Sequence, residues 1–552
     1  FLKDMPEPRA NSVLVESIPE RACKEADLIQ YFNTGVFGRP VVRHAYFVKQ
    51  TADLLLQKRN LDRAKEAVDR ARLRGVEPQR LARLEAMQRE VERSVEELRR
   101  KINTSDDDNS RNAFVTFDTR RDAAIALKLF SPDDAEEIVV TIPPDPSDII
   151  WSDFTVDPNL QAFREIVGYM LILVIFAAFM PVIIYIARFA SLENVKDKLP
   201  FFESLVNNYP KLATLWNGLV GSLSLSLMMS ILPTCLVLII GNLFVLRAQA
   251  WLQLYLQGTY FYFLVLYVLL VTAIGSSLIE TAKYLAQHPM EVFVILADKM
   301  PSRTHFYLSY LSVQWGTHAL NLLRYINLLK FMALALVYDK TQAKEWSEPE
   351  DQDYYGMGSR SARFTLLLVI SLVFCSLTPL MTIIGFINFF LSRIFYTYLF
   401  VYSEVRKADL GGVFWFESLK HVQQGLFLYV ALMTGVLMER ASSLLPAGIT
   451  LLCLVYCVSE YRFFLREFRW ELLEFHELTG DKPTALKGVS YKQPELIGAV
   501  PDTPPEPPTP EGTARDLLQV LQAHLTGLSG AAGGALGGSS AARLRGRAQE
   551  QA

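Results

Sequence analysis

Polar side chains recur at helical spacing inside three long apolar runs of this chain. In a membrane-spanning helix, such groups are costly unless they face protein or water. Residues three, four or seven apart lie on one side of a helix, so each run presents a single polar row. Three helices that each carry one row predict a water-filled groove between them. The rows are Ser222, Ser226, Ser230 and Thr234; Gln314, His318 and Asn321; and Ser276, Glu280 and Lys283.

Each polar row also has a simpler interpretation. Small residues such as serine let membrane helices pack closely, so the first row indicates packing as strongly as it indicates a pore. Gln314, His318 and Asn321 favour a pore, because three large polar groups need more than close packing to explain them. Glu280 and Lys283 either pair with each other near the membrane edge or lie at the outer mouth of a pore.

Glycines in two of these runs allow a helix to bend. Gly316 lies close to Gln314, and Gly275 directly precedes Ser276. A helix that gates a pore needs two conformations, so Gly316 is the preferred hinge and Gly275 the second candidate. Kinks are also frequent in membrane helices that do not gate, so this assignment depends on the pore interpretation.

Composition and motifs give no indication of catalysis. The 552 residues are 51% hydrophobic and carry a net charge of −3, which does not favour nucleic acid as a partner. The sequence has no His-Glu-x-x-His motif, no phosphate-binding glycine loop and no Cys/His metal spacing. Cys453 and Cys457 are interpreted as buried small hydrophobes rather than metal ligands. We therefore predict a protein that is not an enzyme and that uses no metal and no cofactor.

Residues 1–160 are polar and predict a separate α+β domain. Within them, residues 51–103 are rich in Arg, Glu, Leu and Ala and predict a hairpin of two long charged helices. The order of the elements predicts an RRM-like domain into which this hairpin is inserted. Strands are expected over Ser12–Ile18, Val41–Phe47, Ala113–Asp118 and Glu137–Ile142, with helices near Lys24–Phe32 and Arg120–Phe130.

Residues 161–470 predict a transmembrane core, because their apolar runs reach the roughly 20 residues that cross a bilayer. Thr378 and Pro379 predict a tight turn that joins two of the spans. A slight excess of basic residues on one side predicts a cytosolic N-terminal domain and tail. Residues 471–552 predict a cytosolic, largely disordered tail. The eight spans are expected at about Ile166–Ala187, Leu212–Leu246, Ala248–Ile279, Thr304–Leu329, Phe364–Leu380, Thr382–Phe400, Val422–Met438 and Ala441–Ser459.

The RRM-like domain raises the question of RNA binding. RNA-binding members stack bases on aromatic side chains of the two central strands. The matching positions here are Leu14, Asn112 and Phe114, which leave a single aromatic residue. We therefore predict no nucleic-acid partner and interpret the domain as a scaffold or as the contact of a homodimer.

Several motifs, taken in their order along the chain, resemble those of OSCA-type stress-gated cation channels. The cytosolic domain of that family resembles residues 12–19 (SVLVESIP), 112–117 (NAFVTF) and 146–151 (PSDIIW). Its membrane core resembles residues 257–263 (QGTYFYF), 275–277 (GSS), 319–324 (ALNLLR) and 411–415 (GGVFW). The resemblance covers about residues 1–475.

This resemblance implies an anoctamin-like helix bundle, related also to TMC proteins, in which one groove serves either ion conduction or lipid scrambling. Relatives typically have eleven spans, so three helices are expected upstream of the present sequence. The implied ion path runs through the first five spans of this chain. The implied function is a calcium-permeable cation channel that membrane tension or hyperosmotic shock opens, with membrane lipids and permeant cations as its partners. The plasma membrane is the favoured location.

Three positions depart from the family pattern. Several relatives carry an acidic residue where Asn321 stands, and plant members have a lysine near Ser226. Phe416 replaces the proline that usually follows the aromatic residue of the Gly-Gly motif. Losing an acid and a base weakens ion-binding and lipid-phosphate contacts in the groove. The resemblance therefore does not predict the conductance or the ion selectivity.

Two other functions compete with the channel. A lipid scramblase would use the same groove, and it predicts a hydrophilic stripe that faces lipid from one interface to the other. A secondary transporter would show an inverted internal repeat, and the sequence shows no such symmetry.

Overall fold

The computed structural model describes residues 5–73, 78–129, 138–190, 221–272, 287–288, 291–336, 339–347, 356–403, 412–467 and 490–497. By its internal contacts, the chain divides into two units, Phe1–Gln493 and Pro494–Ala552. All the helices and strands named below belong to the first unit.

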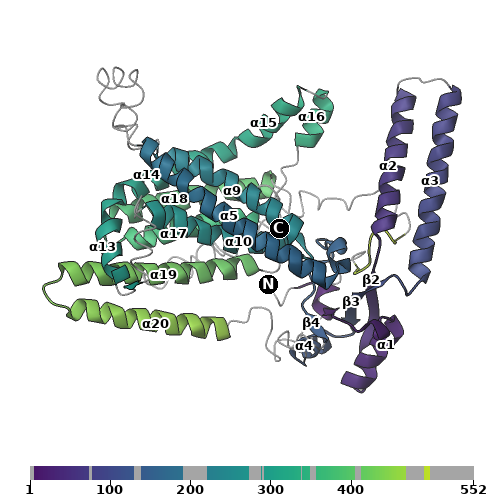
Figure 1. Cartoon of the computed structure of the whole chain (residues 1–552), viewed down its shortest axis with the longest axis horizontal. Coiled ribbons are helices and arrows are strands. Elements are labelled where there is room, and N and C mark those ends of the chain that lie inside the picture. The colour runs from purple at the N-terminus through teal and green to yellow at the C-terminus, as the bar shows by residue number, and fades with distance from the viewer. Residues whose placement is uncertain are drawn as a thin grey trace, which may run out of the picture. The chain divides into compact units, whose positions relative to one another are not determined.

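A four-stranded antiparallel sheet organises the N-terminal domain (Figure 1). Its strand order is β2-β3-β1-β4, with Leu14 of β1 opposite Phe114 of β3. One helical segment follows β1 and another follows β3, so the predicted RRM-like α+β fold is confirmed. The strands are β1 (Ser12–Glu16), β2 (Val42–Lys49), β3 (Asn109–Phe117) and β4 (Val139–Thr141). The helical segments are η1 (Arg9–Asn11), η2 (Glu20–Ala22), α1 (Glu25–Gln30), η3 (Tyr31–Val36), α4 (Arg120–Leu129) and η4 (Trp151–Thr155).

The predicted helical hairpin is inserted between β2 and β3. Its helices α2 (Ala52–Leu73) and α3 (Pro78–Thr104) lie side by side (Figure 1). Leu54, Leu61 and Val68 of α2 are buried at a seven-residue spacing, which is the repeat of a coiled-coil seam. Close to the free end of the pair, Arg72 donates to Glu85 at 2.8 Å.

Both faces of the sheet are covered. Residues of α1, η3 and α4 pack against the face that carries Val15 and Phe117. The opposite face carries Leu14 and Phe114, because successive side chains of a strand alternate between faces. These two residues form a buried cluster with Phe154 of η4. Asn112 of β3 contacts the same cluster, because its side-chain amide donates to the Phe154 carbonyl at 2.7 Å.

Helices make up most of the described chain from residue 158 onward. They are α5 (Pro158–Ala190), α9 (Gly221–Leu243), α10 (Gln249–Leu264), its π-helical extension η6 (Val265–Val271), α13 (Val292–Ser302), α14 (Thr304–Leu322), α15 (Tyr325–Leu334), α16 (Lys340–Ser347), α17 (Met357–Phe374), α18 (Leu380–Tyr402), α19 (Val413–Arg440) and α20 (Leu445–Glu467). Among the described residues, six helices are long and apolar enough to cross a membrane: Asn159–Pro181, Gln249–Val271, Met357–Phe374, Leu380–Tyr402, Val413–Arg440 and Leu445–Arg466.

The predicted total of eight spans stays a prediction. Parts of the second and third predicted spans lie outside the described residues. α14 is described in full but is absent from the six, because its polar row lowers its mean hydropathy.

The predicted span Thr304–Leu329 is wrong as a single helix. α14 ends at Leu322, and Arg324 adopts a left-handed backbone conformation with φ of 51° before α15 begins at Tyr325. A residue with a Cβ atom rarely adopts this conformation, and one such residue interrupts a right-handed helix. The apolar composition of the run therefore conceals a break.

The predicted turn between two spans is confirmed. α17 ends at Phe374 and α18 begins at Leu380, and the Thr378 amide donates to the Phe374 carbonyl at 2.9 Å. Pro379 directly precedes α18, where its fixed φ suits the start of a helix.

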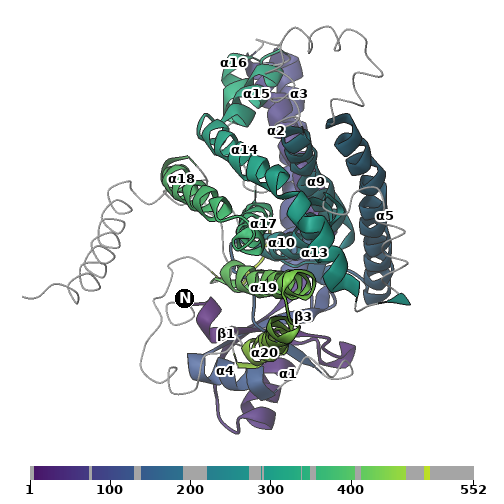
Figure 2. The ribbon, with the colours of Figure 1, turned by 90° about the vertical axis from the view of Figure 1, so that its left-hand side faces the viewer.

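Close packing joins the helices into one bundle (Figures 1 and 2). α10 contacts α9 and α17; α19 contacts α13, α17 and α20; α14 contacts both α18 and α9. A Cβ added to Gly358 at the start of α17 would lie 2.0 Å from the Gln253 carbonyl oxygen, so only glycine permits this approach to α10. Leu452, Val455 and Tyr456 of α20 are exposed, as expected of a helix that faces lipid.

Candidate functional site

The polar row of α14 is buried in the bundle. Gln314 and His318 are 8% and 3% exposed, and Asn321 is half-buried. His318 Nε2 lies 2.9 Å from Ser392 Oγ and 3.2 Å from Asn388 Oδ1, and both of these residues belong to α18. The predicted pore-lining row therefore contacts two polar residues that sequence analysis did not single out.

The contact between α14 and α18 continues toward the end of α14. The Asn321 side-chain amide donates to the Tyr396 hydroxyl at 2.8 Å. The guanidinium of Arg360 on α17 lies over the rings of Tyr396 and Phe400, at 5.0 and 5.2 Å from their centroids. Such cation–π contacts hold a positive charge next to an otherwise apolar surface. Polar groups thus follow α14 and α18 over about two helical turns.

The hydrogen bonds of this row are incomplete. His318 Nδ1 and Asn388 Nδ2 are buried and have no hydrogen-bond partner among the described protein atoms. A buried polar group without a partner costs roughly 1–3 kcal/mol. A conformation that brought this row into contact with water would relieve that cost, so the α14–α18 contact is suited to switching between two states.

The other two predicted rows are described only in part. Ser222, Ser226 and Ser230 fall in α9, but their side chains lie outside the described atoms, and Thr234 is half-buried. α9 contacts α14, so the first two predicted rows belong to neighbouring helices, as a shared groove requires. The remaining candidates lie outside the described residues: Ser276, Glu280, Lys283 and the hinge candidate Gly275.

Gly316, the preferred hinge, lies within the continuous part of α14. A Cβ added there would meet no heavy atom within 4 Å, so packing does not require glycine at this position. The helix is interrupted instead at Arg324, at the far end of the polar row. Gly316 as a hinge stays a prediction, and Arg324 marks a second place at which α14 can change direction.

A π-helical turn lies where α10 approaches α14. η6 is hydrogen-bonded to α14 through Tyr307, which donates to the Leu269 carbonyl at 2.7 Å and lies 2.8 Å from Thr272 Oγ1. On the other side, the Tyr267 hydroxyl donates to the Phe176 carbonyl of α5. Single π-helical turns inside membrane and soluble helices are frequent at functional sites. This turn therefore links α5, α10 and α14, three helices of the implied ion path.

A second buried polar group, centred on Gln257, was not predicted. Its side-chain nitrogen lies 3.0, 3.0 and 3.1 Å from Ser361 Oγ, Ser418 Oγ and the Phe414 carbonyl oxygen, which share its two N–H groups. These partners lie on α17 and α19, so one side chain of α10 holds three helices together. The available signal was a glutamine in an apolar run, with Gln253 four residues before it on the same side.

The turn between α9 and α10 is bound to the N-terminal domain through its backbone. Asp153 Oδ2 accepts hydrogen bonds from the Leu246 and Arg247 amides at 3.0 and 3.1 Å. Asp148 Oδ2 accepts from the Ala250 amide at 2.7 Å, in the first turn of α10, where a carboxylate is favoured by the helix dipole. We call these contacts, together with the ion pair of Arg247, the clamp.

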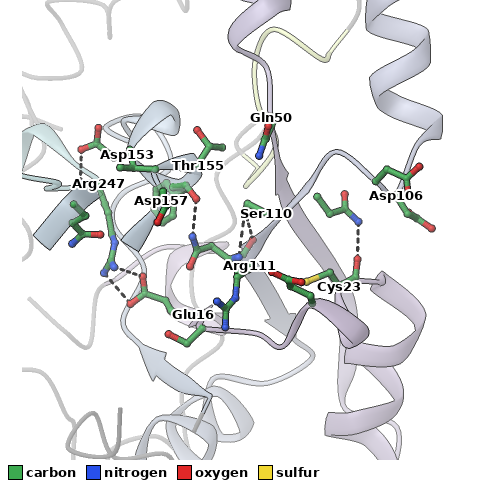
Figure 3. A pocket seen from close by; sticks show the side chains of 18 of the residues that line it. Glu16, Cys23, Gln50, Asp106, Ser110, Arg111, Asp153, Thr155, Asp157 and Arg247 are labelled. Atoms are coloured by element: carbon green, nitrogen blue, oxygen red, sulfur yellow. Dashed lines mark hydrogen bonds and ion pairs between the residues drawn. The ribbon is translucent and has the colours of Figure 1, made fainter. Parts of the chain in front are cut away.

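The ion pair of the clamp joins Arg247 to Glu16 on β1 (Figure 3). Arg247 has a left-handed backbone with φ of 65°, and its two terminal nitrogens lie 2.7 and 2.8 Å from the two carboxylate oxygens of Glu16. Glu16 is 6% exposed, and this burial raises its pKa while the charge of Arg247 opposes the rise. The pair lies at one side of a polar cavity of about 690 Å³, which Asp153 and Asp157 also line.

The part of the chain that the structure describes holds no group of three or more His, Cys, Asp or Glu side chains that could bind a metal ion. The predicted absence of a metal and of a cofactor stays a prediction.

A bundle of apolar spans joined to an RRM-like domain defines a polytopic integral membrane protein. Residues 164–437 match the family model described as "Calcium-dependent channel, 7TM region, putative phosphate". Residues 10–153 match the one described as "Cytosolic domain of 10TM putative phosphate transporter". The two matches follow one another along the chain and together cover most of it. The chain therefore belongs to the OSCA-type family of calcium-permeable channels.

Curated relatives agree with this family at low identity. The chain is 26% identical over 328 residues to CSC1-like protein ERD4 of Brassica juncea, covering 59% of this chain and 45% of the relative. It is 25% identical over 336 residues to hyperosmolality-gated Ca2+ permeable channel 3.1 of Arabidopsis thaliana, covering 60% and 46%. It is 25% identical over 295 residues to phosphate metabolism protein 7 of Saccharomyces cerevisiae, covering 53% and 29%. The chain thus spans less than half the length of these relatives.

Proposed function

We propose that this chain forms the ion-conducting part of a calcium-permeable cation channel that opens under membrane tension, as arises in osmotic stress. The names of relatives such as hyperosmolality-gated Ca2+ permeable channel 3.1 support the permeant ion and the stimulus. The proposed location is the plasma membrane. The N-terminal domain is the proposed contact of a homodimer, and bilayer lipids are the proposed source of the opening force.

The observation that carries the proposal is the buried polar row of α14. Gln314 and His318 lie inside a membrane bundle, and His318 Nε2 is hydrogen-bonded to Ser392 and Asn388 of α18. Large polar groups at such a place mark ion or substrate paths more often than packing contacts. We interpret the conformation as a closed one, in which α18 covers the row.

Opening would move the row of α14 away from α18. Because α14 also contacts α9, a small rotation or separation of α14 would carry Gln314 and His318 toward the side of α9 on which the serine row is predicted. The proposed open path lies among α5, α9, α10 with η6, α14 and α17. Its lining includes the predicted rows, namely Ser222, Ser226, Ser230, Thr234, Ser276, Glu280, Gln314, His318 and Asn321. Tension selects this state because it occupies a larger area in the membrane.

Lipid scrambling through the same groove is the alternative. It requires a polar stripe that faces lipid, whereas Gln314 and His318 are buried against protein in this conformation. In the open state, a scramblase would expose this row to lipid, whereas a channel would keep it enclosed by protein.

The test is to reconstitute the full-length protein in liposomes and to record currents in excised patches under graded pressure. Flipping of labelled lipid is measured on vesicles from the same preparation. Pressure-dependent cation current without flipping is the expected result. Flipping without current would reassign the groove to lipid headgroups, and the absence of both would contradict the proposal.

A further inference from the structure

The face of the sheet opposite α1 and α4 is occupied by a segment from the far end of the first unit. The Tyr491 ring is stacked on the Phe114 ring, with centroids 4.5 Å apart and planes at 11°. Tyr491 is 1% exposed, and its hydroxyl donates to the Pro144 carbonyl at 2.8 Å. Trp151 and Phe154 pack against the edges of the same Phe114 ring, so Tyr491 completes an aromatic cluster.

Gln493 binds the end of the edge strand β2 through its side-chain amide. Its side-chain oxygen accepts from the Lys49 amide at 2.8 Å, and its side-chain nitrogen donates to the Lys49 carbonyl at 2.9 Å. The Tyr46 hydroxyl donates to the same side-chain oxygen at 3.1 Å, and Thr51 Oγ1 lies 3.3 Å from the side-chain nitrogen. Gln493 is completely buried. One side-chain amide thus satisfies both backbone groups of Lys49, as the main chain of an added strand would do at a sheet edge.

The two contacts have the form of a peptide held in a groove. Tyr491 and Gln493 are buried against the domain and the intervening Lys492 is exposed, with a bend at Tyr491 and Lys492. An aromatic side chain supplies the buried anchor, and an amide supplies the specific hydrogen bonds. In RNA-binding relatives of this fold, the same face stacks bases on aromatic residues. Here Phe114 stacks on the protein's own tyrosine.

The segment docks on a domain that also contacts the membrane bundle. It follows α20 along the chain, and residues 468–489 between them lie outside the described part of the structure. The sheet also contacts the α9–α10 turn through the ion pair of Glu16 with Arg247. The same domain therefore carries both the docked segment and a contact with the bundle.

We propose that this face of the sheet is a peptide-docking surface, and that residues 490–493 occupy it as a latch that favours the closed channel. The gating part of the proposal rests on the proposed function. The latch is docked in the conformation in which α18 covers the polar row of α14. It therefore stabilises that conformation relative to any open state in which the latch leaves the sheet.

Docking is tested first, without reference to current. Hydrogen exchange of the full-length protein is compared between the unsubstituted form, Tyr491→Ala/Gln493→Ala and the control Lys492→Ala. The Lys49 amide donates directly to Gln493, so its exchange should become roughly tenfold faster in the double variant and stay unchanged in the control. Equal exchange in all three forms would overturn the docking.

Gating is then tested in excised patches. The double variant should open at lower pressure than the unsubstituted protein and than Lys492→Ala. A synthetic peptide of residues 486–497, applied to the cytosolic side of the unsubstituted channel, should lower the pressure in the same way, and its Tyr491→Ala form should not. Faster exchange with an unchanged or raised opening pressure would overturn the gating role. A lack of current in the unsubstituted protein would instead contradict the proposed function itself, while exchange still decides the docking.

Discussion

At the clamp, carboxylates of the N-terminal domain accept hydrogen bonds from backbone amides of the α9–α10 turn. Arg247 of the same turn forms a bidentate ion pair with Glu16. At the contact of α14 with α18, single side chains meet across two smooth helices, and His318 Nδ1 and Asn388 Nδ2 have no partner among the described protein atoms. The clamp joins carboxylates to backbone amides and to a guanidinium, and hydrogen bonds with such charged groups are stronger than neutral ones. The helix contact uses groups that water could satisfy.

This difference assigns different mechanical roles to the two regions. Backbone hydrogen bonds and a buried ion pair must all break together before the domain leaves the turn, so the clamp transmits force. The α14–α18 contact can exchange its few hydrogen bonds one at a time for bonds to water. We therefore expect substitutions at the clamp to affect folding, and substitutions along α14 and α18 to affect opening.

The largest effect is expected for Arg247→Ala, which tests whether the clamp is structural. The substitution leaves the buried Glu16 without its cation, and breaking a buried pair in this way destabilises by roughly 3 kcal/mol. Thermal unfolding of the purified protein measures it. Lys24→Ala is the control, because Lys24 lines the same cavity but is exposed. If Arg247→Ala and Lys24→Ala unfold at the same temperature, the clamp does not have the structural role that distinguishes it from the α14–α18 contact.

Ser392→Ala is expected to have a smaller effect, on opening rather than on folding. It removes one hydrogen-bonding group that His318 uses in the closed conformation, worth about 1 kcal/mol. The channel should therefore open at lower pressure in patch recordings, and the free energy of unfolding should fall by no more than about 1 kcal/mol. Thr397→Ala, on the exposed side of α18, should behave as the unsubstituted protein does. A higher opening pressure for Ser392→Ala would mean that this hydrogen bond belongs to the open state.

Gly316→Ala tests whether α14 bends. Alanine favours a helix over glycine by up to about 1 kcal/mol, and the open space at Gly316 accepts a methyl group. The fold should be unchanged. Because α14 would be stiffer, the channel should need a higher pressure to open. Gly448→Ala on α20 is the control, because a Cβ there also meets open space. If both variants open at the pressure of the unsubstituted protein, the bend lies elsewhere, with Arg324 as the next candidate.

The smallest expected effect concerns the pKa of His44 on β2. Burial lowers this pKa, and the positive charges of Lys492 and Arg43 lower it further. Lys492→Ala should therefore raise the His44 pKa toward its usual value of about 6.5, as NMR titration of labelled histidines can measure. Because the folded pKa is depressed, the protein loses stability as pH falls below about 6.5, and the variant should lose less. An unchanged pKa would place the latch residue Lys492 away from β2.

The sequence predicted the N-terminal domain in detail because its signals are local. Alternating residues such as Val13 and Val15 mark a strand, and the high content of Arg, Glu, Leu and Ala in residues 51–103 marks the helical hairpin. The turn at Pro379 was predictable for the same reason. The break at Arg324 was not, because a left-handed arginine inside an apolar run leaves no trace in composition or period.

The candidate site was predicted on one helix but not across helices. Gln314, His318 and Asn321 were singled out by their spacing, whereas Asn388 and Ser392, which are also four residues apart on one helix, were not used. Which neighbour faces α14 is decided by packing of the whole bundle, which no single helix encodes. Tyr491 and Gln493 were missed because they lie in a polar stretch whose composition indicates disorder.

The most direct test of the account is whether water reaches Gln314 only when the channel opens. In a full-length protein with its native cysteines replaced, Gln314→Cys is exposed to a membrane-impermeant thiol reagent in patches, with and without pressure, while current is recorded. Thr397→Cys, outside the α14–α18 contact, serves as the control. We predict that Gln314→Cys reacts, and that its current changes, only under pressure. Two results would contradict the assignment of the α14 row to the ion path. One is an equal rate of Gln314→Cys modification with and without pressure, and the other is current under pressure without any modification.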